Sequence, residues 1–362
     1  MKLLVLKETN SNEARVALTP DLVSKYQKLG FEIFLEKGAG GKAGISDEAY
    51  SKAGVQIVQD IEQVLPSVDV IASVQRNEIN LSAVKKGAVF VGMLNPHFQK
   101  EKVVQLIDAG ISSFALELAP RITRAQSMDV LSSQSNLAGY VAVINAVSQM
   151  QKCVPMMMTA AGTVGAARFM ILGAGVAGLQ AIATAKRLGG IVCAFDVRAA
   201  AKEQVQSLGA KFIEVKSNES AETKSGYARE TSDEYKKLQE KLIFDTIANQ
   251  DVVISTALIP GKKAPILISE EMVKNMKAGS IIVDLAAVNG GNCALTKVGE
   301  IAKIHGVTII GHENFASLVS TDASKLYAKN IFNFLELLVD KEKQSLAINF
   351  EDEIIKATFV TK

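Results

Sequence analysis

The chain has 362 residues, of which 48% are hydrophobic and 22% charged, and its formal net charge is +2. This size and composition predict a soluble protein of about two domains with full cores, and the near-neutral charge argues against binding to nucleic acid or a membrane surface. The cysteines Cys153, Cys193 and Cys293 are odd in number and far apart, so we expect buried free thiols rather than a disulfide framework. The four apolar residues before Lys7 are too few for a signal peptide, which favours a cytoplasmic protein.

The first third of the chain alternates short apolar strands with helices. One helix is expected to begin at Thr19-Pro20, an N-cap followed by proline at the first helical position, and to end at Gly30. Another is expected at 99–109. The expected strands are 3–6, 31–35, 68–74, 88–93 and 113–116. Their apolar runs are largely continuous, which is typical of strands buried on both faces of a parallel sheet.

A long helical stretch at 125–150 is interpreted as a bridge to a second series of strands and helices, from Phe169 to Ile310. A helical pattern at 317–338 then predicts a return to the first domain. The further strands of the second series are expected near Ile191, Lys211, Val252, Ile281 and Val307. The sequence thus predicts the α/β class, with two Rossmann-like, doubly wound parallel-sheet domains and a cleft between them. The expected domains are 1–133 with 318–362, and 134–317.

The turn Gly173-Ala-Gly175-Val-Ala-Gly178 stands between an apolar strand and a helical stretch and predicts a dinucleotide site. Gly173 permits the tight turn, Gly175 lets backbone N–H groups approach a pyrophosphate, and Gly178 lets the helix pack on the strand. Asp196, 23 residues after Gly173, ends the next strand and is placed to accept hydrogen bonds from the adenosine ribose hydroxyls. Because a carboxylate there repels a 2′-phosphate, we expect NAD(H) rather than NADP(H). The alternative, a purely structural glycine turn, is disfavoured by this context.

Two further segments each leave two interpretations open. Lys216–Lys241 is rich in charge and nearly free of aliphatic residues, so it is either a solvated excursion or a lid beside the cofactor. The run 120–134 gathers arginines, glutamines, serines and an acid, which either orient a ligand or, through Asp129 and Ser127, cap the following helix. Arg15, after the first strand, is likewise either a carboxylate-binding residue or a solvated loop residue.

The histidines are informative mainly by their spacing. His312 follows a strand, and a structural role is favoured for it. The histidines and cysteines lack metal-ligand spacing, so no metal site is expected.

Together, these motifs resemble one family. Glu13-x-Arg15-Val-Ala with Thr19-Pro20 is similar to the start of proteins in the superfamily of alanine dehydrogenases and proton-translocating transhydrogenases. The run from Arg121 to Tyr140 resembles the NAD(H)-binding alpha component of the transhydrogenases specifically. Four further segments also resemble this transhydrogenase component: 155–164, the Gly173 turn, 256–261 and 290–293.

The resemblance implies a soluble subunit that binds NAD(H) and passes hydride between NADH and NADP+ held on a partner subunit, coupled to proton translocation. It implies a membrane-spanning subunit and an NADP(H)-binding subunit as partners, a homodimer, and peripheral association with the inner face of the membrane. In the implied nicotinamide loop, Arg121, Asp129 and Ser132 fix the ring and its carboxamide, and Gln126 reaches toward the partner's nucleotide.

The other cofactor-binding residues that the resemblance implies are Gly173, Gly175, Val176, Ala177, Gly178, Asp196, Val197, Arg198, Gly226, Tyr227, Gln239, Thr256, Ala257 and Leu258. Of these, Gly226, Tyr227 and Gln239 match the family's mobile loop. Thr231 stands in that loop where methionine is expected, which puts an apolar contact of the loop in doubt.

An alanine dehydrogenase is the main alternative. That reaction needs a cation for the substrate carboxylate and a general base, and alanine dehydrogenases use a lysine, a histidine and an aspartate. The matching positions here hold Gln75, Asn95 and Val288, and only Arg15 persists. Hydride transfer between two nicotinamides requires alignment and exclusion of water but no acid or base, so these replacements favour a transhydrogenase. A non-catalytic NAD(H)-sensing subunit stays open as a third possibility.

Overall fold

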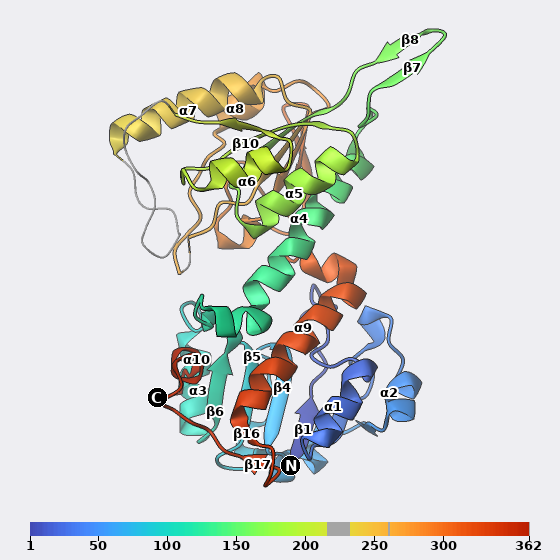
Figure 1. Cartoon of the computed structure of the whole chain (residues 1–362), viewed down its shortest axis with the longest axis vertical. Helices are drawn as coiled ribbons and strands as arrows, with labels where there is room; N and C mark the ends of the chain where they lie inside the picture. The colour runs from blue at the N-terminus through green and yellow to red at the C-terminus, as the bar shows by residue number, and fades with distance from the viewer. Residues whose placement is uncertain (216–231, 260, 362) are drawn as a thin grey trace. The chain divides into compact units, whose positions relative to one another are not determined.

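The computed structural model describes residues 1–215, 232–259 and 261–361. The chain forms two compact units: 1–134 with 316–362, and 135–315. Each unit is built on one predominantly parallel sheet with helices packed beside it (Figure 1). The predicted α/β class with two Rossmann-like domains is confirmed. Within the described part of the chain, no helix has the length and hydrophobicity needed to cross a membrane.

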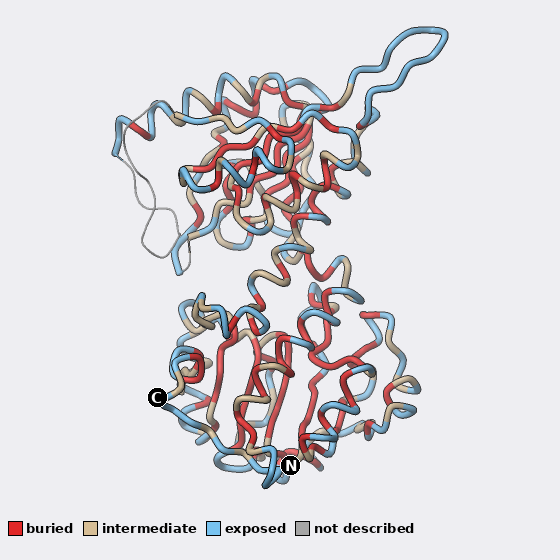
Figure 2. Tube along the Cα trace, viewed as in Figure 1, coloured by how far each residue is buried: buried red, intermediate tan, exposed pale blue. Residues whose placement is uncertain are grey.

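The sheet of the first unit has six parallel strands in the order β3-β2-β1-β4-β5-β6. Most residues of its strands are buried (Figure 2). Successive side chains of β1 point to opposite faces, so Leu3 and Val5 enter one apolar core while Leu4 and Leu6 enter another. The strands are β1 Lys2–Val5, β2 Glu32–Glu36, β3 Gln56–Val58, β4 Val70–Gln75, β5 Val89–Met93 and β6 Ser112–Ala115.

The C-terminal return supplies one of the main helices of this unit, α9 (Ser320–Leu335). Tyr327 of α9 is fully buried, and its hydroxyl donates to the carbonyl oxygen of Ser73 at 2.9 Å. The last residues lie along β6, where the amide of Val360 donates to the carbonyl of Ser113 at 2.9 Å. The other helices are α1 Val23–Lys28, α2 Asp47–Ala53, α3 Lys100–Asp108 and α10 Glu353–Thr358, and a short ribbon pairs β16 Val339–Asp340 with β17 Ser345–Leu346.

The sheet of the second unit has the order β11-β10-β9-β12-β13-β15-β14, and only β14 is antiparallel to its neighbour. The chain order reverses at β9, which lies between β10 and β12. The carboxyl ends of these three strands therefore meet at one edge, where open α/β sheets place ligands. The strands are β9 Arg168–Leu172, β10 Ile191–Phe195, β11 Lys211–Ile213, β12 Val252–Ser255, β13 Ile281–Asp284, β14 Ile301–Ile304 and β15 Val307–Ile310.

Helix α4 (Val130–Gln149) starts in the first unit and ends in the second. The other helices of the second unit are α5 Val176–Arg187, α6 Ala201–Ser207, α7 Asp233–Ile247 and α8 Glu270–Asn275. The interpretation of 216–241 as one long loop is wrong at its end, because 233–241 are the first residues of α7. The hydroxyl of Ser232 caps this helix by accepting the amide of Tyr235 at 3.2 Å.

A hairpin that the sequence analysis did not anticipate, β7 (Met157–Thr159) with β8 (Gly162–Val164), extends from the second unit and is exposed throughout (Figures 1 and 2). Cys153 precedes it and is exposed, so the expectation that all cysteines are buried is wrong for this residue. Cys193 is half-buried and Cys293 buried.

Candidate functional site

The glycine turn after β9 is shaped by steric requirements at two of its glycines. Gly173 has φ +96°, and a Cβ on it would lie 2.7 Å from the hydroxyl oxygen of Thr256. A Cβ on Gly178 would lie 1.9 Å from the carbonyl oxygen of Gly173, so the first turn of α5 packs directly on the loop. A Cβ on Gly175 would meet no atom within 4 Å, which leaves open space at the middle of the turn.

The first turn of α5 borders this open space. Gly175 is the N-cap and has no side chain to accept the first amide groups of the helix. These amides and the helix dipole favour an anion at this end. Val176 follows with 39% of its surface exposed, and Ala177 is half-buried. The arrangement suits a phosphate group that approaches over Gly175.

Asp196, at the carboxyl end of β10, ties the glycine turn to the neighbouring strand. Its Oδ2 accepts the amide of Ala174 at 2.7 Å, and its side chain is 6% exposed. Arg198 wraps the same carboxylate: its backbone amide and Nε donate to Oδ1, each at 2.9 Å, and its Nη2 donates to Oδ2 at 2.9 Å. Val197, between them, is half-buried. The structure therefore brings Asp196 and Arg198 together at the glycine turn.

The loop after β12 completes this edge. The amide of Thr256 donates to the carbonyl of Leu172 at 2.8 Å, and its hydroxyl donates to the carbonyl of Gly173 at 3.0 Å. These bonds hold Thr256 and Ala257 against the glycine turn. Leu258 follows, with 47% of this large apolar side chain exposed. Residues from three strand ends, β9, β10 and β12, thus meet at one place in the second unit.

Helix α4 also packs against this edge, through a glycine whose steric role the sequence analysis missed. A Cβ on Gly139 would lie 2.1 Å from the carbonyl oxygen of Ala177. Only glycine therefore allows α4 to lie this close to the start of α5. The sequence did contain a signal, namely a glycine inside a long helical pattern. Glycine at such a position lowers helix stability by roughly 1 kcal/mol relative to alanine, so its presence indicates close packing at that point.

The predicted nicotinamide loop lies in the first unit, around a 3-10 helix at Thr123–Met128. The side chains of Arg121 and Gln126 are exposed. The carbonyl of Ser127 accepts hydrogen bonds from two amide side chains of the α9 region, Asn330 at 2.8 Å and Asn333 at 2.9 Å, which anchor the loop.

Asp129 caps α4, as one of the two interpretations of this run proposed. Its Oδ1 accepts the amide of Ser132 at 2.8 Å, and its Oδ2 accepts the hydroxyl of the same residue at 2.5 Å. Asp129 and Ser132 are therefore brought together.

Three further residues were predicted to bind the cofactor, from the segment that ends in α7. Gln239 is half-buried in α7. Gly226 and Tyr227 lie outside the described residues, as does Thr231.

Arg15 is not a solvated loop residue. It is 4% exposed, and its Nε and Nη2 donate to the two carboxylate oxygens of Glu13 at 2.7 and 2.6 Å. Its Nη1 donates to Gln134 at 2.9 Å, and Gln75 donates to Glu13 at 3.2 Å. Glu8 lies nearby, and burial raises the pKa of its carboxyl from 4.5 to about 7, with the negative charge of Glu13 adding to the rise. The guanidinium of Arg15 thus already holds a carboxylate from its own chain.

His312 makes two contacts that are compatible with the structural role favoured from the sequence. Its Nε2 lies 3.3 Å from the side-chain oxygen of Asn145, and its ring packs edge-on against Phe315 with centroids 5.3 Å apart. Burial lowers the pKa of the imidazole. In the part of the chain that the structure describes, no cluster of histidine, cysteine and acidic side chains is arranged to hold a metal ion.

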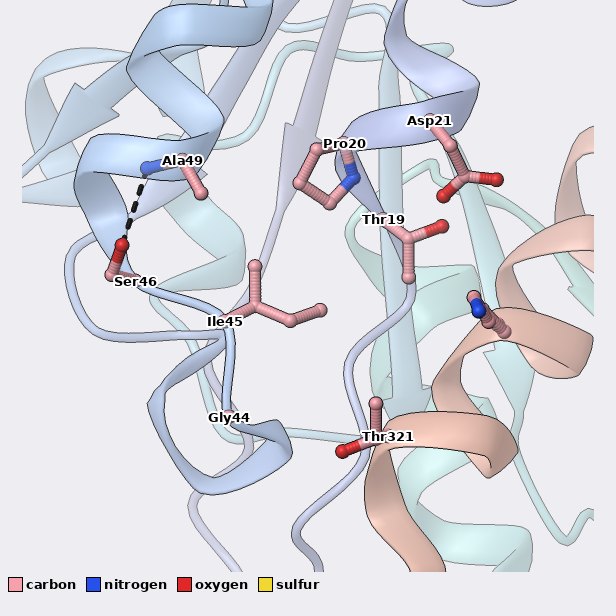
Figure 3. A pocket seen from close by; sticks show the side chains of 9 residues that line it. Thr19, Pro20, Asp21, Gly44, Ile45, Ser46, Ala49 and Thr321 are labelled. Carbon is pink, nitrogen blue, oxygen red and sulfur yellow. Dashed lines mark hydrogen bonds between the residues drawn. The ribbon is translucent and has the colours of Figure 1, made fainter.

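A pocket of about 330 Å³ lies in the first unit, beside the start of α9 (Figure 3). It contains none of the residues predicted for the cofactor. Its lining residues are Thr19, Pro20, Asp21, Gly44, Ile45, Ser46, Ala49, Thr321 and Lys325.

Comparison with known proteins agrees with this geometry. Residues 4–138 match the family described as "Alanine dehydrogenase/PNT, N-terminal domain", and residues 142–362 match "Alanine dehydrogenase/PNT, C-terminal domain". The chain is 50% identical over 370 residues to an NAD(P) transhydrogenase alpha subunit protein of Rhodospirillum rubrum, covering 100% of this chain and 96% of that protein. The solved transhydrogenase structure from Sinorhizobium meliloti is 47% identical with a TM-score of 0.90, covering 99% of this chain and 98% of the other.

Similarity to alanine dehydrogenases is weaker. The alanine dehydrogenase of Bacillus subtilis is 30% identical over 290 residues, which cover 79% of this chain and 71% of that enzyme. The chain therefore belongs to the alanine dehydrogenase/PNT family and, within it, to the NAD(P) transhydrogenase alpha subunits.

Proposed function

We propose that this chain is the NAD(H)-binding subunit of an NAD(P) transhydrogenase, active only together with partner subunits. One observation favours it over an alanine dehydrogenase: the positions where those enzymes hold a lysine, a histidine and an aspartate are Gln75, Asn95 and Val288. The amide of Gln75 is engaged by Glu13, and Val288 is an exposed apolar side chain. None of the three can act as a general acid or base for an amino-acid substrate.

The carboxyl edge of the second sheet has the features that a dinucleotide requires. Space over Gly175 and the uncapped first turn of α5 would receive the pyrophosphate. Asp196 would accept hydrogen bonds from the adenosine ribose hydroxyls, beside Arg198. Leu258 would contact the cofactor through its exposed apolar surface. These fits support nicotinamide nucleotide binding at this edge.

We further propose that the bound nucleotide is NAD(H) and that NADP(H) is held on a partner. The buried carboxylate of Asp196 would face the 2′-phosphate of NADP(H), and repulsion between two anions at such a site is strong. The guanidinium of Arg198 donates two hydrogen bonds to Asp196, so this nearby cation is already paired with a carboxylate and is poorly placed to receive that phosphate.

The bound dihydronicotinamide would supply the hydride that passes to the partner's NADP+. In this proposal, Arg121, Asp129 and Ser132 hold the nicotinamide ring and its carboxamide, and Gln126 reaches the partner's nucleotide. The hydrogen bonds between Asp129 and Ser132 would fix the orientation of these two side chains. The role of the protein would be to align the two rings and exclude water, because the transfer itself needs no protein acid or base.

The lid interpretation of the segment that holds Gly226 and Tyr227 stays a proposal, since both lie outside the described residues. Gln239, in α7, would contribute from the helix that follows. The proposed partners are a membrane-spanning subunit and an NADP(H)-binding subunit, so that this chain associates with the inner face of the membrane through them and hydride transfer is coupled to proton translocation.

We propose that the hairpin β7–β8 binds a second copy of this chain. Three successive methionines before and on β7, Met156, Met157 and Met158, are 61%, 39% and 79% exposed. A hairpin without a sheet to support it is marginally stable in water, and exposed apolar side chains favour a protein partner. Sedimentation should show a dimer that Met158→Asp weakens and Thr163→Ser leaves intact. A wild-type monomer at micromolar concentration would contradict the homodimer.

The decisive experiment mixes the purified chain with a transhydrogenase NADP(H)-binding component and measures hydride transfer between NADH and NADP+. We expect transfer only when both proteins are present, and no alanine-dependent reduction of NAD+ by the chain alone. Robust alanine oxidation would favour the alanine dehydrogenase alternative. Tight NADH binding without transfer in the mixture would favour a sensing subunit.

A further inference from the structure

The loop that ends at Leu258 is held by a buried side chain from a distant part of the chain. Asn292 is completely buried and faces the backbone of Ala257, 35 residues earlier. Its Oδ1 accepts the Ala257 amide at 3.0 Å, while its Nδ2 donates to the Ala257 carbonyl at 2.9 Å. The second hydrogen of Nδ2 goes to the carbonyl of Pro265 at 2.8 Å. One side-chain amide therefore satisfies both backbone groups of Ala257.

Asn292 is itself held from behind by a buried carboxylate. Oδ2 of Asp284, at the end of β13, accepts the amide of Asn292 at 2.8 Å, the amide of Cys293 at 3.0 Å and the hydroxyl of Thr296 at 2.7 Å. Asp284 is also completely buried. Because a buried charge requires several well-aligned donors, this network fixes the backbone from which Asn292 extends.

The chain of contacts leads directly to the glycine turn. Ala257 follows Thr256, whose hydroxyl is bonded to the carbonyl of Gly173. A Cβ on Gly173 would lie 3.3 Å from the Ala257 amide nitrogen, so the clamped peptide lies against the turn itself. Leu258, exposed by 47%, is the next residue. Its backbone position depends on where the Ala257 peptide is held.

We propose that Asn292 is a positioning residue for nucleotide binding. It holds the Ala257 peptide against the glycine turn, so that Leu258 stands ready to contact the nucleotide before the nucleotide arrives. No other common side chain has this size together with one acceptor and two donors in one plane. Aspartate would lose both donated bonds and place a second carboxylate beside Asp284, and leucine would make none of the three bonds. The inference rests on the proposed binding of NADH at this edge.

The test compares Asn292→Ala with a matched control, Ser280→Ala, by NADH fluorescence titration and urea unfolding. Ser280→Ala removes a buried hydrogen bond in the same unit, from the Ser280 hydroxyl to the Gln250 carbonyl at 3.1 Å, but leaves the contacts of Asn292 and Asp284 untouched. We expect both variants to unfold at lower urea than the wild type. Only Asn292→Ala should weaken NADH binding, by about tenfold or more, which corresponds to about 1.4 kcal/mol. The NADH affinity of Ser280→Ala should remain within about twofold of that of the wild type.

Equal weakening in the two variants would show that Asn292 has only a structural role and would overturn the inference, as would unchanged NADH binding in Asn292→Ala. A wild-type chain that binds no NADH would instead overturn the proposed function. If Asn292→Ala does not fold, amide hydrogen exchange in the wild type tests the inference instead. The Ala257 amide should be protected without nucleotide and change little when NADH is added. An Ala257 amide that exchanges fast until NADH is present would refute a preformed clamp.

Discussion

Replacing Glu8 by glutamine should remove a large part of the pH dependence of stability. Glu8 follows β1 and is 5% exposed, and its carboxylate accepts the amide of Val74 at 2.7 Å and that of Gln75 at 3.2 Å. Burial, reinforced by the charge of Glu13, raises its pKa from 4.5 to about 7 despite these bonds. The folded chain therefore holds the Glu8 proton more tightly than the unfolded chain does.

The magnitude follows from this difference. Stability contributed by the protonated Glu8 is fully present below its unfolded pKa of 4.5 and is lost as the pH rises through about 7. Between pH 5 and pH 8, the loss amounts to about 2.5 kcal/mol of unfolding free energy. Glutamine cannot ionise, but its NH2 group cannot accept the second of the two backbone amides, so Glu8→Gln should lose some stability at every pH. Because only the wild type loses the contribution of the protonated acid, the stability of Glu8→Gln relative to the wild type should rise by about 2.5 kcal/mol between pH 5 and pH 8.

Urea unfolding followed by circular dichroism at both pH values measures this difference. Comparing the variant with the wild type cancels the contributions of all other titrating groups. Glu101→Gln makes the same chemical change at an exposed position on α3 and should keep the wild-type pH dependence. If Glu8→Gln loses as much stability between pH 5 and pH 8 as the wild type, the assignment of a raised pKa to Glu8 is wrong.

Three further predictions concern the nucleotide site. Gly139→Ala places a Cβ 2.1 Å from the Ala177 carbonyl and should lower the free energy of unfolding by about 1–3 kcal/mol, whereas Gly41→Ala, which meets no atom within 4 Å, should change it little; equal effects in urea unfolding would refute the close packing of α4. Gln126→Asn should leave NADH binding nearly intact and slow hydride transfer in the reconstituted complex, by up to about a hundredfold; a parallel loss of NADH affinity would contradict its proposed place toward the partner. Asp196→Asn should narrow the preference for NADH over NADPH in fluorescence titrations, and a wild type that binds both equally would refute the role of this carboxylate.

Much of the fold could be predicted because its signals are local. Continuous apolar runs at 68–74 and from Ile281 predicted buried parallel strands, and the observed strands β4 and β13 lie there, inside their sheets. The start of α7 was missed because its residues are mostly charged, although Ser232 followed by acidic residues is a helix-capping pattern. The hairpin β7–β8 was missed because its short strands lack the alternation of apolar and polar residues that a half-buried strand shows.

What the sequence determined by itself is therefore most of the parallel strands in their chain order and the glycine turn with its acid, because those features depend on neighbours within one strand–helix–strand unit. Tertiary structure alone decided which buried polar groups meet. Arg15 and Gln134 are 119 residues apart and bond at 2.9 Å, and Asn292 clamps a peptide 35 residues away. The physical reason is that a buried polar group must find a partner at hydrogen-bond distance and angle, and that geometry comes from packing rather than from spacing along the chain.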